Sequence, residues 1–271
     1  MNEPHVNPTA WQPVTPRGVA AFARAGTGRL WLVQSLVALI AAGVTVWFFD
    51  RAWIPTIEAA LERLPETGEI RNGQLLWPGD SPVRLAEGAF LALSVDPEHT
   101  GPLRSPADLE VEFGRASVIF RSLFGEAEVA YPPRDAFPFN RIELQARWGA
   151  WKPAVLAGVG AVTFLALWLC WQALAALYAL PAWIIAFYAD RELTLIGSWR
   201  LAGAALLPGA LWLALATALY GAGVLDLLRW LLAFGAHLVI GWGYVVAGAR
   251  AAPRSPEAAA RKNPFAAGGP R

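Results

Sequence analysis

Apolar and polar stretches alternate along this chain on a scale that predicts membrane spans separated by one polar segment. A helix needs about 20 mostly apolar residues to cross the hydrocarbon core of a bilayer. The first such run covers residues 30–49 and is flanked by Arg29 and by Asp50-Arg51. Its length, and the lack of a small-residue cleavage pattern after it, favour an uncleaved signal anchor over a signal peptide.

The second apolar run, residues 153–189, is longer than one crossing but short for two crossings and a turn. We interpret residues 153–178 as a transmembrane helix and residues 179–200, which contain Pro181, as an interfacial segment rich in aromatic residues. An extra span within that segment is the open alternative. Two further spans are expected at about residues 201–221 and 228–249, which completes a bundle of four transmembrane helices over the chain.

Residues 50–152 show shorter periodicities that are typical of a folded domain. Residues 51–64 place apolar side chains on one helical stripe, which predicts a short amphipathic helix. Asn72-Gly73 lies between two strand-like stretches and is a strong signal for a two-residue hairpin. Further strands are predicted at residues 89–95, in two segments broken at Gly114-Arg115, around a turn at Gly125-Glu126, and at residues 140–146. The predicted fold class is therefore an integral membrane α-helical protein with four spans and an α+β domain, mainly antiparallel sheet, packed on the leading helix.

Composition agrees with a membrane protein. Of the 271 residues 56% are hydrophobic and only 16% are charged, against about 25% in soluble chains. The 14 Trp residues suit a protein with many membrane–water interfaces. The single cysteine, Cys170, lies in an apolar run and excludes an intrachain disulfide.

The distribution of charge predicts the orientation. Arg and Lys exceed acidic residues in residues 1–29 and in residues 250–271, which favours the cytoplasm for both termini. Residues 50–152 carry 11 Lys and Arg against 16 Asp and Glu, a net charge of −5, and are expected outside. The two terminal segments are rich in Pro, Ala and Gly and are expected to be disordered cytoplasmic tails.

The stretch LPETG at residues 64–68 matches the recognition sequence of sortase transpeptidases, which anchor proteins to the Gram-positive cell wall. A sortase signal is followed closely by a hydrophobic span, whereas here a predicted hairpin follows and the next span begins far downstream. The structural interpretation is preferred: Pro65 ends the amphipathic helix and Gly68 permits the turn into the first strand.

Two places in the sequence are candidate functional sites. Asp96, Glu98 and His99 lie within four residues and could contribute to a metal site, although a turn that closes a strand is the favoured interpretation. His237 lies near the middle of the fourth predicted span, where an ionisable residue suggests a proton relay or a ligand. A neutral imidazole that is hydrogen-bonded to a neighbouring helix explains His237 equally well, with Gln34, Gln172, Thr163 and Thr217 as possible partners.

The stretch LPETGEIRNGQLLWPGD, followed by a strand that ends in Val95-Asp96, resembles a bacterial family of uncharacterised membrane proteins, some encoded beside maltodextrin-uptake genes in Gram-positive bacteria. The stretch SWRLAGAALLP resembles the polar entry of that family's third span. The resemblance implies one N-terminal span, an extracytoplasmic β-rich domain and a C-terminal helical membrane region, in the bacterial cytoplasmic (inner) membrane. It implies no activity.

The sequence contains no phosphate-binding loop, dinucleotide fingerprint, paired-cysteine motif or nucleophile elbow, so we expect no enzyme activity, catalytic residue, cofactor or resident metal. We expect a non-enzymatic accessory or sensory subunit whose outward domain binds a partner or ligand. Its partners would be the lipid bilayer and another membrane or envelope protein, with no nucleic acid. The alternatives are a small transporter or channel subunit that uses His237, and an extracytoplasmic metal-dependent hydrolase that uses Asp96, Glu98 and His99.

Overall fold

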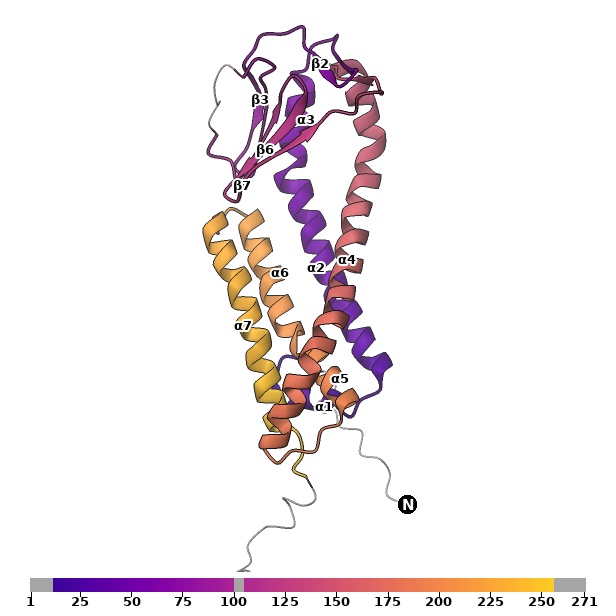
Figure 1. Cartoon of the computed structure of the whole chain (residues 1–271), viewed down its shortest axis with the longest axis vertical. Coiled ribbons are helices and arrows are strands. Elements are labelled where there is room, and N and C mark those ends of the chain that lie inside the picture. Colours follow the sequence, from indigo (N-terminus) through magenta and orange to yellow (C-terminus); the bar gives the residue numbers. More distant parts are fainter. Residues whose placement is uncertain (1–11, 100–104, 256–271) are drawn as a thin grey trace, which may run out of the picture. The chain divides into compact units, whose positions relative to one another are not determined.

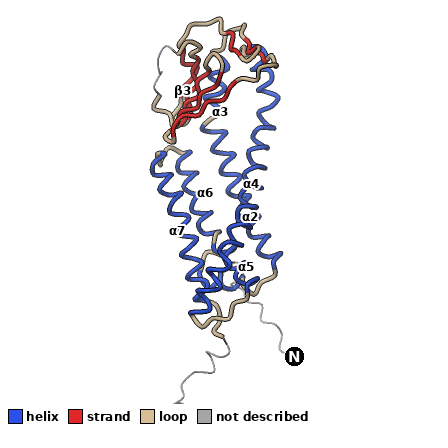
Figure 2. Tube along the Cα trace, in the orientation of Figure 1, coloured by secondary structure: helices blue, strands red, loops and turns tan. Residues whose placement is uncertain are grey.

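The computed structural model describes residues 12–99 and 105–255, which form two compact units. The helical unit comprises residues 1–44 and 161–271, and the sheet unit comprises residues 45–160. Two long helices, α2 (Thr27–Ala52) and α4 (Arg141–Tyr188), each contribute residues to both units. The described elements of the helical unit are helices joined by loops, whereas the strands belong to the sheet unit (Figures 1 and 2).

Within the described residues, four helical segments are long and apolar enough to cross a membrane. They are Thr27–Glu62, Arg141–Tyr188, Leu195–Gly221 and Leu227–Ala251. The first combines α2 with α3 (Ile54–Glu62), the third combines α5 (Leu195–Ala205) with α6 (Leu207–Gly221), and the fourth is α7. The break between α5 and α6 precedes Pro208, whose ring cannot continue the hydrogen-bond ladder of a regular helix. The four membrane-length apolar helices agree in number with the spans that hydropathy predicts.

Four local predictions differ from the structure. The turn expected at Gly125-Glu126 lies instead at residues 123–124, because Ser122 pairs with Gly125. Residues 1–29 were expected to be disordered, but Pro16–Phe22 form helix α1, which Thr15 caps and in which Val19 and Phe22 are fully buried. A helix end was expected near residue 178, but α4 continues through Pro181 to Tyr188. Residues 140–146 were predicted as a strand and instead begin α4, because Asn140 Oδ1 accepts a hydrogen bond from the Glu143 N–H and caps the helix.

Small residues bring the helices of the helical unit close together. A Cβ atom on Gly248 of α7 would lie 2.9 Å from Val19 of α1, and one on Gly209 of α6 would lie 2.5 Å from the carbonyl oxygen of His237 in α7. The core between them is apolar, with Leu30, Leu201, Leu207 and Val245 fully buried. Close approach at glycines is a typical way for membrane helices to gain packing contacts.

One polar network lies inside this apolar core. Gln34 of α2 is fully buried, and its Oε1 accepts a hydrogen bond of 2.9 Å from Gln172 Nε2 of α4. Gln34 Nε2 donates to the carbonyl oxygen of Gly203 in α5 at 3.4 Å. Three helices are therefore joined by side-chain amides.

The sheet unit contains two sheets. The smaller has the order β2-β1-β8, with β1 Glu69–Arg71, β2 Gln74–Leu76 and β8 Phe137–Pro138, and all its pairs are antiparallel. The larger has the order β3-β4-β5-β6-β7, with β3 Val83–Glu87, β4 Leu91–Val95, β5 Leu109–Phe113, β6 Ser117–Ser122 and β7 Gly125–Ala130. Because β4 and β5 are parallel, the larger sheet is mixed, which refines the expectation of a mainly antiparallel sheet.

The two faces of the larger sheet differ in chemistry. One face packs against α3: Leu85, Val95 and Phe113 meet Ala60 and Leu64 in a shared apolar core. The other face carries Ser94, Glu110 and Glu112, which are also buried. Strand alternation explains the division, since neighbouring side chains along a strand point to opposite faces.

Candidate functional site

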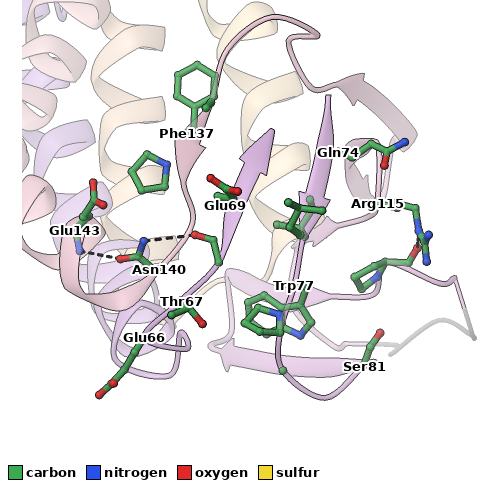
Figure 3. Close-up of a pocket in the computed structure, with 18 of the residues that line it drawn as sticks. Glu66, Thr67, Glu69, Gln74, Trp77, Ser81, Arg115, Phe137, Asn140 and Glu143 are labelled. Carbon is green, nitrogen blue, oxygen red and sulfur yellow. Dashed lines mark hydrogen bonds between the residues drawn. The ribbon is translucent and has the colours of Figure 1, made fainter. Parts of the chain in front are cut away.

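A cleft of about 860 Å³ lies entirely within the sheet unit, around the small sheet. Its walls come from five separate parts of the chain, and Figure 3 labels side chains from four of them. These parts are residues 66–69 before and at β1, residues 74–81 from β2 onward, the loops at residues 97–98 and 115, and residues 136–143 around β8 and the start of α4. The volume lies within the range of small-molecule and cofactor pockets, about 300–1,000 Å³.

The LPETG stretch forms one wall of this cleft. The Gly68 carbonyl oxygen accepts hydrogen bonds from the Phe139 N–H at 2.9 Å and from Asn140 Nδ2 at 3.4 Å. Gly68 has a φ of +151°, and a Cβ atom there would lie 2.7 Å from the carbonyl oxygen of Phe139. The glycine therefore allows the chain after α3 to lie directly against the chain that enters α4, and Asn140 both braces the wall and caps the helix (Figure 3).

The predicted hairpin forms the second wall. Arg71 pairs with Gln74 across a two-residue turn, in which Asn72 and Gly73 both have positive φ, 52° and 72°. This confirms the prediction from Asn72-Gly73. On its other side, β2 is joined to the β5–β6 turn, because the Leu75 N–H donates to the Arg115 carbonyl oxygen at 2.7 Å.

Apolar side chains are available to a ligand in the cleft. Leu76 is 48% exposed and Phe137 is 43% exposed. The indole of Trp77 is fixed, because its Nε1 donates to the Asp80 carbonyl oxygen at 2.9 Å and its ring packs on Phe139 with the centroids 6.0 Å apart. Aromatic and aliphatic surface beside a few polar groups is the usual lining of a binding site.

The charged groups of the cleft are paired. Four glutamates line it, and each lies within 3.6 Å of an arginine nitrogen: the pairs are Glu66–Arg141, Glu69–Arg71, Glu98–Arg115 and Glu143–Arg147. Exposed pairs of this kind contribute little to stability, but they largely cancel the negative charge of the lining. The cleft therefore offers carboxylate oxygens as hydrogen-bond acceptors without a strong net charge.

In the structure, Asp96, Glu98 and His99 each interact with a different residue. Asp96 is buried and accepts a long hydrogen bond, 3.5 Å, from Ser81 Oγ. Glu98 lies 3.6 Å from Arg115 at the cleft, and His99 Nδ1 lies 3.4 Å from Glu112 Oε1. Within residues 12–99 and 105–255, no group of three or more His, Cys, Asp or Glu side chains could hold a metal ion. Of the three, Glu98 alone lines the cleft.

His237 contacts its own helix, and three of the four polar partners considered for it bond elsewhere. Its Nδ1 is in contact with the carbonyl oxygen of Phe234, one turn earlier in α7, and its ring packs on the Phe234 ring. Gln34 and Gln172 bond to each other instead, and Thr217 bonds to Leu213 and Trp230. The structure thus places His237 in a local contact on its own helix.

A second group of ionisable residues lies on the polar face of the larger sheet. The Glu112 side chain is 3% exposed and is bridged between Arg121 and His99. Glu110, two residues earlier on β5, is 8% exposed, and its Oε1 has no hydrogen-bond partner within the described residues. Burial raises the pKa of Glu110 above its ordinary value, and the nearby Arg121 and Arg84 partly oppose that shift. At the sheet edge, hydrogen bonds from Ser105 and Arg84 lower the pKa of Glu87.

Sequence reasoning missed most of the cleft. Trp77, Phe137 and Asn140 carry no motif, and they come together because β8 returns to pair with β1 across nearly 70 residues. One usable signal was the aromatic residue in the loop Trp77-Pro78-Gly79, since an aromatic side chain in a turn-rich loop is a common ligand contact. Comparison of the chain with protein-family models, with curated proteins and with solved structures finds no match.

Proposed function

We propose that this protein is a non-enzymatic accessory or sensory membrane subunit whose sheet unit binds a partner or ligand in the cleft beside the small sheet. The observation that carries the proposal is the cleft itself, with its volume of about 860 Å³ and its mixed lining. Half-exposed Leu76 and Phe137 lie in it together with the amides of Gln74 and Asn140.

The lining favours an occupant with both apolar and hydrogen-bonding groups. Phe137 and Leu76 offer apolar contact, which is the main favourable term in most associations. The paired glutamates offer acceptors whose positions their arginine partners restrain, so less side-chain entropy is lost on binding. Because the lining is nearly neutral in charge, we do not expect affinity to depend steeply on salt.

The membrane topology belongs to the same proposal. Residues 50–152 would face the outside of the bacterial cytoplasmic membrane and both termini would face the cytoplasm, since the terminal segments are basic and residues 50–152 have a net charge of −5. The four membrane-length helices would contact another membrane protein or lipid. The resemblance to the bacterial family with an extracytoplasmic β-rich domain agrees with this topology.

Site-specific photo-crosslinking tests the proposal in native membranes. A benzophenone amino acid would replace Phe137, which lines the cleft, or Val129, which is 56% exposed on β7 and outside the lining. We expect a discrete adduct from position 137 that is absent from position 129, and that weakens when Leu76→Ser is added. Equal products at both positions, or no adduct at 137, would contradict a binding role for the cleft.

A further inference from the structure

The hairpin formed by β6 and β7 ends in two exposed apolar side chains. Ser122 pairs with Gly125, so the turn consists of Leu123 and Phe124, which are 65% and 77% exposed. Two-residue turns usually carry Asn, Asp or Gly, because these residues tolerate the backbone conformation and water. Leucine and phenylalanine at the most exposed point of a hairpin therefore indicate a tip that contacts something apolar.

Strand register places this tip at one defined end of the larger sheet. Gly125 pairs with Ser122, and Ser122 pairs with Leu109 at the first position of β5. Leu109 in turn pairs with Leu91, and its N–H donates to the carbonyl oxygen of Phe90 at 3.1 Å. The tip and Phe90 thus lie at the same end of the sheet, about three strand spacings of 4.8 Å apart.

A contact of Phe90 places this end of the larger sheet beside the last residues of the apolar run in α2. The Phe90 ring packs edge-on against Phe48 of α2, with the centroids 5.4 Å apart. Phe48 belongs to the last turn of the apolar run at residues 30–49, and Asp50-Arg51 follow at once. Because charged residues mark where a span leaves the hydrocarbon core, Phe48 and Phe90 lie at the level of the membrane–water interface when α2 crosses the bilayer.

The tip is built for an uncharged apolar surface. Arg121 is the nearest cation on β6, and it is bound to Glu112 at 2.5 Å and to Glu126 at 2.8 Å. Within the turn, the Phe124 N–H is satisfied by Ser122 Oγ at 3.2 Å. Contact with lipid through this tip therefore leaves the Phe124 N–H bonded and does not require anionic headgroups.

We propose that Leu123 and Phe124 insert into the interface of the same bilayer that α2 crosses, and so attach the sheet unit to the membrane at a second point. The cleft lies at the other end of the sheet, because Glu98 and Arg115 follow the far ends of β4 and β5. Insertion of the tip would hold the cleft facing away from the membrane. This inference needs only that α2 spans the bilayer and does not depend on what the cleft binds.

The test uses the full chain in proteoliposomes of phosphatidylcholine, alone or mixed with phosphatidylglycerol. In a Cys170→Ser background, a single cysteine at Phe124→Cys or Arg134→Cys carries an environment-sensitive fluorophore. Arg134 is an exposed control at the opposite end of β7, beyond Tyr131, whose N–H donates to Ala116. Quenchers in the acyl chains and iodide in the water report on the two surroundings separately.

We expect acyl-chain quenchers to remove most of the fluorescence at position 124 and to leave position 134 unchanged, with iodide showing the reverse, in both lipid compositions. A label at 124 that iodide quenches as readily as one at 134 would overturn the proposal. Shielding from both quenchers would indicate a protein contact and would also overturn it, as would lipid quenching that depends on phosphatidylglycerol. Gel filtration and circular dichroism that match the Cys170→Ser parent establish that each labelled chain is folded.

Discussion

Arg121 Nη1 donates a 2.5 Å hydrogen bond to Glu112 Oε2, and the Glu112 side chain is almost completely enclosed by the sheet unit. The Arg121 Nε donates to Glu126 at 2.8 Å, so one guanidinium joins β5, β6 and β7. A buried carboxylate needs such a partner, because leaving it alone in a low dielectric is costly.

Arg121→Met should therefore destabilise the sheet unit by about 3 kcal/mol, the low end for a broken buried pair, since Arg121 is itself partly exposed. Hydrogen–deuterium exchange of peptides from β5 measures the loss in the full chain. Adding Glu112→Gln removes the stranded charge and should restore much of the protection. A double variant that exchanges as fast as Arg121→Met would show that lost packing, not the buried charge, is responsible.

Glu110 predicts a pH dependence of local stability. Burial raises its pKa in the folded state, so the folded chain binds more protons than the unfolded chain between the ordinary carboxyl pKa of about 4.5 and the raised value. Local stability should fall as pH rises through that window, and Glu110→Gln should flatten the dependence and increase protection at neutral pH. Hydrogen–deuterium exchange of β5 peptides measures both effects, once the rates are corrected for the pH dependence of intrinsic amide exchange.

Glu87 should give local stability the opposite pH dependence to that of Glu110. Ser105 and Arg84 lower its pKa, so its contribution to stability is present above the ordinary carboxyl pKa and is lost as pH falls through the lowered value. Glu87→Gln should therefore reduce protection of β3 at neutral pH, whereas Glu110→Gln should increase that of β5. The same direction of change in both variants would refute the assigned electrostatics.

The Gln34–Gln172 hydrogen bond should couple α2 to α4. A double-mutant cycle with Gln34→Leu and Gln172→Leu, measured by unfolding in detergent, should give a coupling energy of about 0.6 kcal/mol, the mean for hydrogen bonds between membrane helices, with about 2 as the upper bound. Leu32→Ala, at an exposed position of α2, serves as an uncoupled control with Gln172→Leu. Strictly additive effects of the two glutamine substitutions would contradict the coupling.

Gly209 should resist substitution, whereas Gly235 of the neighbouring helix α7 should not. Its Cβ would lie 2.5 Å from the His237 carbonyl oxygen, so Gly209→Ala forces α6 and α7 apart and should cost about 1–3 kcal/mol. Gly235→Ala in α7 is the matched control, because no heavy atom lies within 4 Å of the added carbon there. Thermal unfolding in detergent should show a lower midpoint temperature for Gly209→Ala than for the wild type, and no decrease for Gly235→Ala. Equal midpoints for the two variants would refute the close contact.

Elements that are determined by residues adjacent in the sequence could be predicted. The Asn72-Gly73 hairpin follows from the backbone freedom of these two residues, and the membrane-length helices follow from hydropathy. The prediction of a strand at residues 140–146 was wrong. Seven alternating residues fit either a strand or a helix, and the cap between Asn140 and the Glu143 N–H favours the helix.

Tertiary contacts determined what could not be predicted. Helix α1 is held by the burial of Val19 and Phe22 among other helices, which a Pro-rich tail does not reveal. The parallel pairing of β4 with β5 depends on a long connection that carries no period. The cleft depends on β8 pairing with β1, so its residues share no local pattern.

The central claim is that the cleft of the sheet unit holds a partner or ligand, and co-purification tests it most directly. The full chain would be extracted from native membranes in mild detergent and analysed by native mass spectrometry beside Leu76→Ser/Phe137→Ser in the cleft and Val129→Ser outside it. We predict a bound non-lipid species on the wild type and on Val129→Ser that is lost from the cleft variant. The same bound species on all three, or none on the wild type, would contradict the account.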